Sequence, residues 1–532
     1  MKININLSPA VSLIKQKFSV QEKIEQEDKI ILNKDEKTGN IDDINNLRNI
    51  AFLTQGISEK KSLQKSIITG TAAGTLITGA CAAASYITGS ALPAMAAVPL
   101  GIAGGIMAGV ITARKGTEGK NQTETEGREK SGELKTSLAM DGYMIPQNEG
   151  RIKHMCFTFG NMGQEKPAYL NAMKTFISSM DDAKFTILTS DEQGRREVKD
   201  EIMKWCNDGT ISSPERITVI STGANLSIWA QDSTLVQGSK IMEQDRMDFP
   251  QQGDWKVASS LAGVNPELTY ERVKGRFIDG GNQLPTMDNI YIGSDAITFM
   301  MKDMKNYPQK YNTIKGDLHI DAKDVSHEEL CKLMLDRTFP KQKVVIIGNN
   351  EGQPAFHIDM AMTPLGKIDP ETGKKVVTVG DPSMAIKILK DIKEREPFKY
   401  ERYERNIENT VTWGPLKPLD NLLYTMDGDR ELQEKFDSLA ADLEKDGFKV
   451  ERLPYLGTTK LKYVPWITYN NAVIDGDNIF IPNFGIDELD TAGNSVYEKY
   501  GYNTIPVDMN AVSSFRGALN CITKVIEREY TL

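Results

Sequence analysis

The chain has 532 residues and a mass of 59.2 kDa, which is more than one ordinary domain needs. A composition of 39% hydrophobic and 26% charged residues excludes a fully disordered chain, a collagen and a multi-span membrane protein. A net charge of −9 argues against general nucleic-acid binding, which requires a basic face. Five widely spaced cysteines and only four histidines argue against a disulfide scaffold, a zinc ribbon and a multi-histidine metal site, and they favour a reducing compartment.

The N-terminal part contains two segments of opposite character. Residues 1–65 are a polar, lysine-rich extension without the apolar run of a secretory signal. Residues 66–113 contain no charged residue, and each half is long enough to cross a bilayer. Glycines four apart would let two helices approach closely, and basic residues on both flanks favour cytosolic ends. We therefore expect a membrane hairpin at 66–113; the alternative is a soluble helical hairpin packed on the protein or on a second copy.

The remaining chain reads as a polar linker followed by one large domain. Residues 114–149 are rich in Gly, Glu, Lys and Thr, which predicts a solvated linker. Over residues 150–532, short apolar runs alternate with amphipathic patterns, which predicts an α/β domain. A helix is expected within 429–447, with Gly447 at its C-terminal end. Strands are expected from Lys153 and at 185–189, 217–221, 343–348 and 376–380.

Four short motifs in this domain carry reactive side chains. They are WAQDS at 229–233, FIDGGNQLPT at 277–286, FHIDMAMTPLG at 356–366 and FRGALNCIT at 515–523. Singly, each has an ordinary structural explanation, since a GGN is usually a turn and a cysteine near a C-terminus is usually a small core residue. His357 and Asp359 are two apart, so on a strand they would share one face. Together the motifs supply a thiol, an imidazole and carboxylates.

This set of groups suits a guanidinium substrate. A guanidinium is planar, always charged, and offers five N–H donors. Two carboxylates can bind it through paired hydrogen bonds and keep it protonated, so that its central carbon stays electrophilic. A thiolate can then attack this carbon, while a histidine protonates the leaving ammonia and afterwards activates water.

The motif order resembles the guanidino-group-modifying, or pentein, superfamily, and most closely the agmatine deiminases and protein-arginine deiminases. TYNNAVIDGDNIFIPNFG at 468–485 resembles the agmatine-deiminase stretch before its nucleophile, and NCIT at 520–523 is similar to that family's HCIT. FIDGGN at 277–282 resembles its acidic-Gly-Gly-Asn turn, whereas WAQD at 229–232 is closer to the protein-arginine deiminase form. The resemblance covers about residues 150–532. It implies a five-bladed α/β propeller of ββαβ units, although the sequence alone does not display a fivefold repeat.

The resemblance also implies roles for the matching residues. Cys521 would be the nucleophile, and His357 would be the general acid and base. Asp359 and Asp232 would bind the guanidinium. Six further residues would line the substrate pocket: Trp229, Asp279, Gly280, Gly281, Asn282 and Asn520. No metal or cofactor is needed for this chemistry, and activation by calcium stays open.

The sequence therefore predicts a guanidine deiminase that acts on protein arginine or on an agmatine-like small molecule, giving a ureido product and ammonia. An amidinotransferase is an alternative, because its first half-reaction is identical. A non-catalytic, membrane-anchored interaction protein is a second alternative, in which the reactive residues would be a relic. We expect no nucleic-acid partner, and a location at the membrane with the catalytic domain in the cytosol, or otherwise in the cytoplasm.

Overall fold

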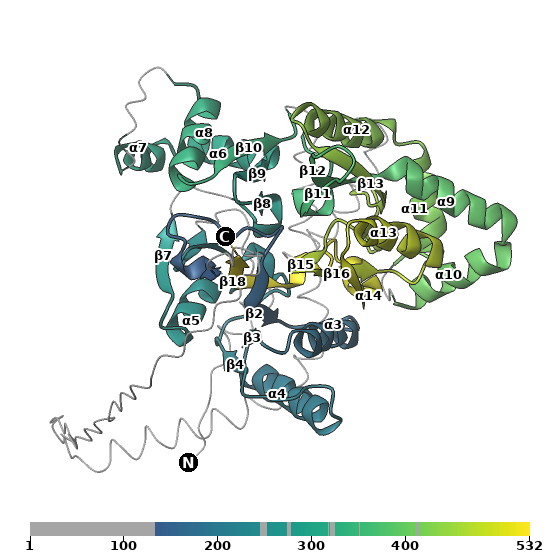
Figure 1. Cartoon of the computed structure of the whole chain (residues 1–532), viewed down its shortest axis with the longest axis horizontal. Coiled ribbons are helices and arrows are strands. Elements are labelled where there is room, and N and C mark those ends of the chain that lie inside the picture. The colour runs from purple at the N-terminus through teal and green to yellow at the C-terminus, as the bar shows by residue number, and fades with distance from the viewer. Residues whose placement is uncertain are drawn as a thin grey trace, which may run out of the picture. The chain divides into compact units, whose positions relative to one another are not determined.

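The computed structural model describes residues 134–244, 253–273, 278–317, 319, 325–349, 352–410 and 414–531 (Figure 1). All of them belong to one compact unit, Thr125–Leu532. The expected extension at 1–65 and the apolar hairpin at 66–113 lie outside the described residues, so the membrane hairpin stays a prediction. In the part of the chain that is described, no helix is both long and apolar enough to cross a bilayer.

The described residues form an α/β unit whose five sheets repeat one ββαβ plan. In each, two strands pair antiparallel, and a helical connection leads to a third strand that is parallel to the second. The α/β class expected from the sequence is therefore confirmed, whereas a closed five-bladed arrangement stays a prediction. The five strand triples are β5 (Thr234–Gln237), β6 (Lys240–Gln244) and β7 (Thr269–Val273); β8 (Gln283–Pro285), β9 (Asn289–Gly293) and β10 (Lys343–Ile347); β11 (Met362–Ile368), β12 (Lys375–Asp381) and β13 (Lys449–Leu456); β15 (Val473–Asp475), β16 (Asn478–Asn483) and β17 (Asn503–Asp508); and β18 (Lys524–Thr531), β2 (Arg151–Phe159) and β3 (Lys184–Thr189).

Three further strands extend two of these sheets. β1 (Leu134–Thr136) pairs with β18, β4 (Ile217–Ser221) pairs with β3, and β14 (Ile467–Thr468) pairs with β13. The strands β3, β4, β10 and β12 coincide with four of the apolar runs in the sequence, and β2 includes the run expected from Lys153. β3 and β12 are buried along most of their length, as is typical of a continuous apolar run, whereas β4 and β10 are mostly half-buried.

Helices occupy the connections between parallel strands (Figure 1). Two of the connections are large, and helices of the one between β12 and β13 pack against β13. The short connections contain α3 (Lys166–Ser179), α4 (Glu192–Asn207), α5 (Lys256–Val264) and α13 (Asp487–Lys499). The large ones contain α6 (Ser294–Asn306), α7 (Pro308–Asp317) and α8 (His327–Thr338), and then α9 (Pro382–Arg395), α10 (Pro397–Thr410), α11 (Pro418–Asp427) and α12 (Arg430–Lys445); the short α14 (Asn510–Ser513) precedes the final motif.

The helix expected within 429–447 is confirmed as α12. Asp429 caps its start by accepting a hydrogen bond from the backbone N–H of Leu432 at 3.3 Å. Phe436 and Leu443 are buried on one face of the helix. Gly447 follows the helix end with φ of +92°, a conformation that favours glycine.

Residues 134–149, which the sequence assigns to the end of the linker, are part of the folded unit. β1 pairs with the C-terminal strand β18, and Met144 and Ile145 are buried. The side-chain hydroxyl of Ser137 accepts a hydrogen bond from the backbone N–H of Arg528 at 2.9 Å. The polar composition of this segment gives no sign that these few residues are buried.

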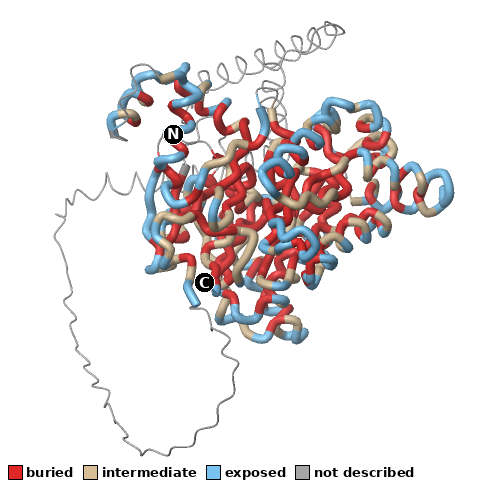
Figure 2. Tube along the Cα trace, turned by 45° about the horizontal axis from the view of Figure 1, so that its top comes forward, coloured by how far each residue is buried: buried red, intermediate tan, exposed pale blue. Residues whose placement is uncertain are grey.

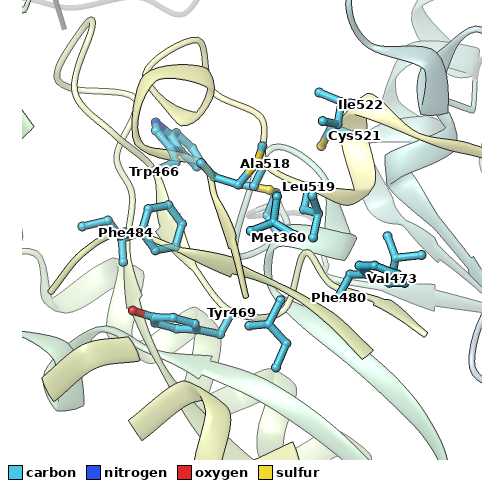
Figure 3. Close-up of a cluster of buried hydrophobic side chains, with 14 of the residues drawn as sticks. Met360, Trp466, Tyr469, Val473, Phe480, Phe484, Ala518, Leu519, Cys521 and Ile522 are labelled. Carbon is cyan, nitrogen blue, oxygen red and sulfur yellow. The ribbon is translucent and has the colours of Figure 1, made fainter. Parts of the chain in front are cut away.

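Buried residues run through the interior of the unit (Figure 2), and the largest apolar cluster reaches the final motif. Leu519 and Ile522, on either side of Cys521, are fully buried in this cluster. The same cluster includes Met360, which lies beside Leu519, and Trp466 (Figure 3). Burial of a Leu or Ile side chain contributes about 1.5–3 kcal/mol, so apolar packing fixes the backbone on both sides of the Cys521 thiol.

Candidate active site

Four short 3-10 turns bring the predicted residues together. Each turn directly precedes the first strand of a ββαβ unit: β5, β8, β11 and β18. The turns contact one another although they lie far apart in the sequence. They are η2 (Ala230–Asp232), η3 (Gly280–Asn282), η4 (Ile358–Met360) and η5 (Asn520–Ile522).

The expectation that His357 and Asp359 share a face of a strand is wrong. His357 has extended backbone and is the N-cap residue of η4, whereas Asp359 lies within this turn. The physical reason is that β11 begins only at Met362, so the HxD motif lies in the turn before the strand. Both side chains nevertheless reach the same site, because the backbone curves tightly at this turn.

Cys521 carries a buried thiol beside a carboxylate. Only 2% of Cys521 is exposed, and its Sγ lies 4.0 Å from Asp359 Oδ2. Burial, together with the negative charges of Asp359 and Asp232, raises the pKa of the Cys521 thiol well above its usual range. The thiol of the free protein is therefore protonated at neutral pH. A bound cation between the carboxylates would reverse the electrostatic part of this effect.

Asp359 is the most deeply buried carboxylate of the site, with 1% exposure. Its Oδ2 accepts a hydrogen bond from Asn520 Nδ2 at 2.9 Å. Burial raises the pKa of Asp359 to about 7, against the opposing effects of His357 and the Asn520 hydrogen bond. A cationic ligand would favour the ionised form, so Asp359 is suited to bind a charged group.

The His357 imidazole lies between two carboxylates. Its Nε2 is 3.3 Å from Asp279 Oδ2, and its Nδ1 is 3.8 Å from Asp232 Oδ1. Nδ1 has no hydrogen-bond partner among the described residues. Asp279 thus orients the ring through one nitrogen, which leaves the other nitrogen available to take up or release a proton.

The Asp-Gly-Gly-Asn turn packs so tightly that only glycine fits at its centre. A Cβ at Gly280 would lie 1.7 Å from the carbonyl oxygen of Gln231, and a Cβ at Gly281 would lie 2.6 Å from His357 Nδ1. The backbone N–H of Gly281 donates to Asp232 Oδ1 at 2.9 Å. The turn therefore packs against His357 and positions Asp232, whereas its place in a substrate pocket stays a prediction.

Asn471 is a site residue that motif reasoning missed. Its Oδ1 accepts hydrogen bonds from the backbone N–H groups of Asn520 at 2.8 Å and of Cys521 at 3.3 Å. Asn471 is fully buried. It belongs to the TYNN stretch that supported the family resemblance, so the sequence contained a signal for it. Asn471 positions the turn that carries the thiol.

Gln353 is a second missed residue, and it braces the pocket wall. Its Nε2 donates to Asn282 Oδ1 at 2.7 Å and to the carbonyl of Phe356 at 3.0 Å. Its Oε1 accepts from the backbone N–H of Asp295 at 3.1 Å. Gln353 thereby connects the η3 turn to the residue before His357. No local sequence pattern marks it.

Trp229 packs against the segment that leads to the nucleophile. A Cβ at Gly517 would lie 2.3 Å from the indole Cζ3 atom, so the ring covers this glycine. Arg516, just before it, has φ of +70°, which is strained for a residue other than glycine. The expected place of Trp229 in the lining of the substrate pocket stays a prediction.

The described residues contain no group of three or more His, Cys, Asp or Glu side chains that could hold a metal ion. The site instead combines two buried carboxylates, an oriented imidazole and a buried thiol. These groups can bind a planar cation, transfer protons and make a covalent bond.

No protein-family model matches the chain, and no curated protein matches it in sequence. Similar solved structures include agmatine deiminases from C. jejuni and Enterococcus faecalis. Both are 13% identical to this chain; they cover 74% and 72% of it and 96% and 95% of their own chains, with TM-scores of 0.44 and 0.45. An amidinotransferase of saxitoxin biosynthesis from Microseira wollei is 10% identical with a TM-score of 0.35, covering 73% of this chain and 98% of its own. These enzymes are members of the pentein superfamily that the motifs resemble.

Proposed function

We propose that this protein is a guanidine deiminase, which hydrolyses a guanidinium group to a ureido product and ammonia. One observation carries the proposal. Cys521, His357, Asp359 and Asp232 come from three distant segments, yet they converge in one buried site with the Cys521 thiol 4.0 Å from Asp359 Oδ2. A purely structural role does not require a desolvated thiol beside buried carboxylates, which costs folding free energy.

In the proposed reaction, Asp359 and Asp232 bind the guanidinium through charge-assisted hydrogen bonds. Bound positive charge lowers the pKa of the Cys521 thiol, so the thiolate forms when substrate is present. The sulfur attacks the central carbon and forms a C–S bond. His357 then gives a proton to one nitrogen, and ammonia leaves as the C–N bond breaks, which produces a thiouronium on Cys521.

The second half-reaction uses water. His357 takes a proton from a water molecule, whose oxygen attacks the thiouronium carbon. The C–S bond breaks, the thiolate of Cys521 is regenerated, and the ureido product leaves. If an amine replaced water in this step, the same residues would catalyse amidino transfer. We further propose that the five ββαβ units close into the five-bladed propeller expected from the family resemblance, with this site at its centre.

The test is an assay of the full chain on agmatine, free arginine and a blocked arginyl peptide, with and without an acceptor amine. We expect ammonia and ureido product from at least one substrate. The Cys521→Ala variant should be inactive, whereas Cys206→Ala should be active, because Cys206 is a partly exposed thiol on α4, outside the site. Acid quenching during turnover should trap an adduct on the peptide that contains Cys521.

Three outcomes would redirect the proposal. Turnover by Cys521→Ala equal to that of the wild type would exclude the covalent mechanism. Product that carries the acceptor amine would identify an amidinotransferase. A folded protein that turns over none of the substrates, with or without the amine, would favour the non-catalytic interaction protein.

A further inference from the structure

A second buried feature adjoins the proposed site. It is a cavity of about 20 Å³ lined by Asp359 and Asn520 on one side. Residues of β8, β11 and β15, together with Gln147, Asn148, Asn470 and Ala472, complete its wall. Cys521, His357 and Asp232 do not line it. Of the predicted site residues, only Asp359 and Asn520 line the cavity.

Three residues of the cavity wall carry unsatisfied polar atoms. Asn148 Oδ1, Asp359 Oδ1 and Asn470 Nδ2 are buried, and none has a hydrogen-bond partner among the described residues. The other polar atom is already engaged in two of them: Asn470 Oδ1 accepts from Thr378 Oγ1 at 2.8 Å, and Asp359 Oδ2 accepts from Asn520 Nδ2 at 2.9 Å. Asn470 and Asp359 are each 1% exposed. Buried polar atoms left unpaired in this way are costly, so they require a partner.

The size and polarity of the cavity select that partner. A cavity needs about 10–15 Å³ to hold one water molecule, and the water needs two to four polar partners. The wall offers two acceptors and one donor, which matches a water that donates twice and accepts once.

We propose that this cavity binds one structural water molecule, which donates a hydrogen bond to Asp359 Oδ1 and thereby favours the ionised carboxylate. The binding part of this inference stands on the cavity alone, whereas its catalytic consequence rests on the proposed function. The charged, titratable and polar groups that act on Asp359 are His357, Asp232, Cys521 and the amides of Asn520 and Asn471. The water would supply a further stabilising hydrogen bond at Asp359 Oδ1, the oxygen that Asn520 does not engage.

Two substitutions in the full chain test the inference, one by removing the space for the water and one by removing a hydrogen-bond acceptor. Ala472→Val fills the cavity with methyl groups, and Asn148→Leu removes one acceptor while keeping a similar volume. Ala472→Ser is the matched control, because it leaves room for the water. Crystals of the wild type and the variants should be grown without ammonium salts, so that water is the available occupant.

We expect an electron-density peak within hydrogen-bond distance of the Asn148 and Asn470 side chains in the wild type and in Ala472→Ser, but not in Ala472→Val. The absence of a peak in the wild type would overturn the binding site. This measurement needs no substrate, so it holds even if the protein turns over none of the guanidino compounds.

The effect on Asp359 has a separate readout. A hydrogen bond to a charged group is worth about 1.5–3 kcal/mol, so its loss should move the acid limb of kcat/KM to higher pH by about one unit or more. We expect this shift in Ala472→Val and Asn148→Leu, but not in Ala472→Ser. The pH dependence of the unfolding free energy should shift in the same direction and serves where no substrate is turned over. Coincident profiles for all four proteins would overturn the role of the water in the ionisation of Asp359.

Discussion

Gly281 is the residue at which the site tolerates no side chain. An added Cβ would lie 2.6 Å from His357 Nδ1 and 3.1 Å from Asp359 Oδ2. Both distances are shorter than an ordinary van der Waals contact. Since Gly281 also donates its backbone N–H to Asp232, a shift of this residue would move three reactive side chains together. Glycine is needed at this position because it has no side chain, and not because its backbone is flexible.

The first prediction concerns Gly281→Ala. A displacement of about 1 Å in a catalytic group can lower activity about 10²-fold, and we expect a loss of at least this size in kcat/KM. Gly263→Ala is the matched control, since a Cβ at Gly263 on α5 would meet nothing within 4 Å. Activity of Gly281→Ala close to that of Gly263→Ala would show that the turn does not shape the site.

The second prediction concerns Asp359 and the pH dependence of stability. Its pKa is raised to about 7 in the folded protein, so between about pH 4 and pH 7 the folded state holds a proton that the unfolded state has lost. The free energy of unfolding should therefore fall as the pH rises through this window, by at most about 1.4 kcal/mol per pH unit. The Asp359→Asn variant should lack this loss.

Urea unfolding of the wild type and Asp359→Asn at several pH values measures this effect. The variant should gain stability relative to the wild type as the pH rises from 5 to 8. Parallel curves for the two proteins would mean that Asp359 ionises at its ordinary pH in the folded state.

At the scale of elements, the helix α11 is capped by a residue of another helix. Glu404 on α10 accepts hydrogen bonds from the backbone N–H groups of Leu419 and Asp420, both at 2.8 Å. These are among the N–H groups that a helix start leaves without internal partners. Lys417, at the N-cap position, supplies no side-chain cap and has φ of +55°. The carboxylate of Glu404 therefore replaces the usual local cap.

The third prediction is that Glu404→Ala destabilises the folded unit by about 2 kcal/mol, because two buried or half-buried donors lose their acceptor. Glu401→Ala is the control, since Glu401 is exposed on the same helix. Chemical denaturation measures both variants, and kcat/KM should be unchanged in each. Equal stability of the two variants would contradict the capping role.

The sequence predicted elements well where one residue pattern determines one structure. The largely apolar runs expected at 343–348 and 376–380 correspond to β10 and β12. The spacing of His357 and Asp359 was less informative, because two residues at i and i+2 can meet on a strand or across a tight turn. Gln353 could not be predicted, since its partner Asn282 is 71 positions away and no periodic pattern connects them.

At the scale of the whole folded unit, the C-terminal strand is a central strand. β18 lies between β1 and β2, which come from the start of the described residues. Its Arg528 is 1% exposed and donates through one guanidinium nitrogen to the carbonyls of Glu149 and Gly150, at 3.1 and 2.9 Å. Cys521 lies just three residues before this strand begins. The Cys521 thiol is thus held next to a central strand of this sheet.

The fourth prediction is that a chain ending at Thr523 does not fold, although it keeps Cys521 and every other predicted site residue. Loss of β18 would expose the edges of β1 and β2 and leave the carbonyls that Arg528 satisfies without donors. Removal of Leu532 alone is the control and should leave the melting temperature unchanged. Cooperative thermal unfolding of the shorter chain, followed by circular dichroism, would contradict the prediction.

The position of β18 also bears on how the protein is made. Translation proceeds from the N-terminus, so the residues of β18 leave the ribosome long after those of β1, β2 and β3. The sheet that contains β2 and β3 can therefore be completed only once β18 has been made, and Cys521, just before this strand, is made at nearly the same time. Until then, the edges of β1 and β2 that pair with β18 are open to other chains.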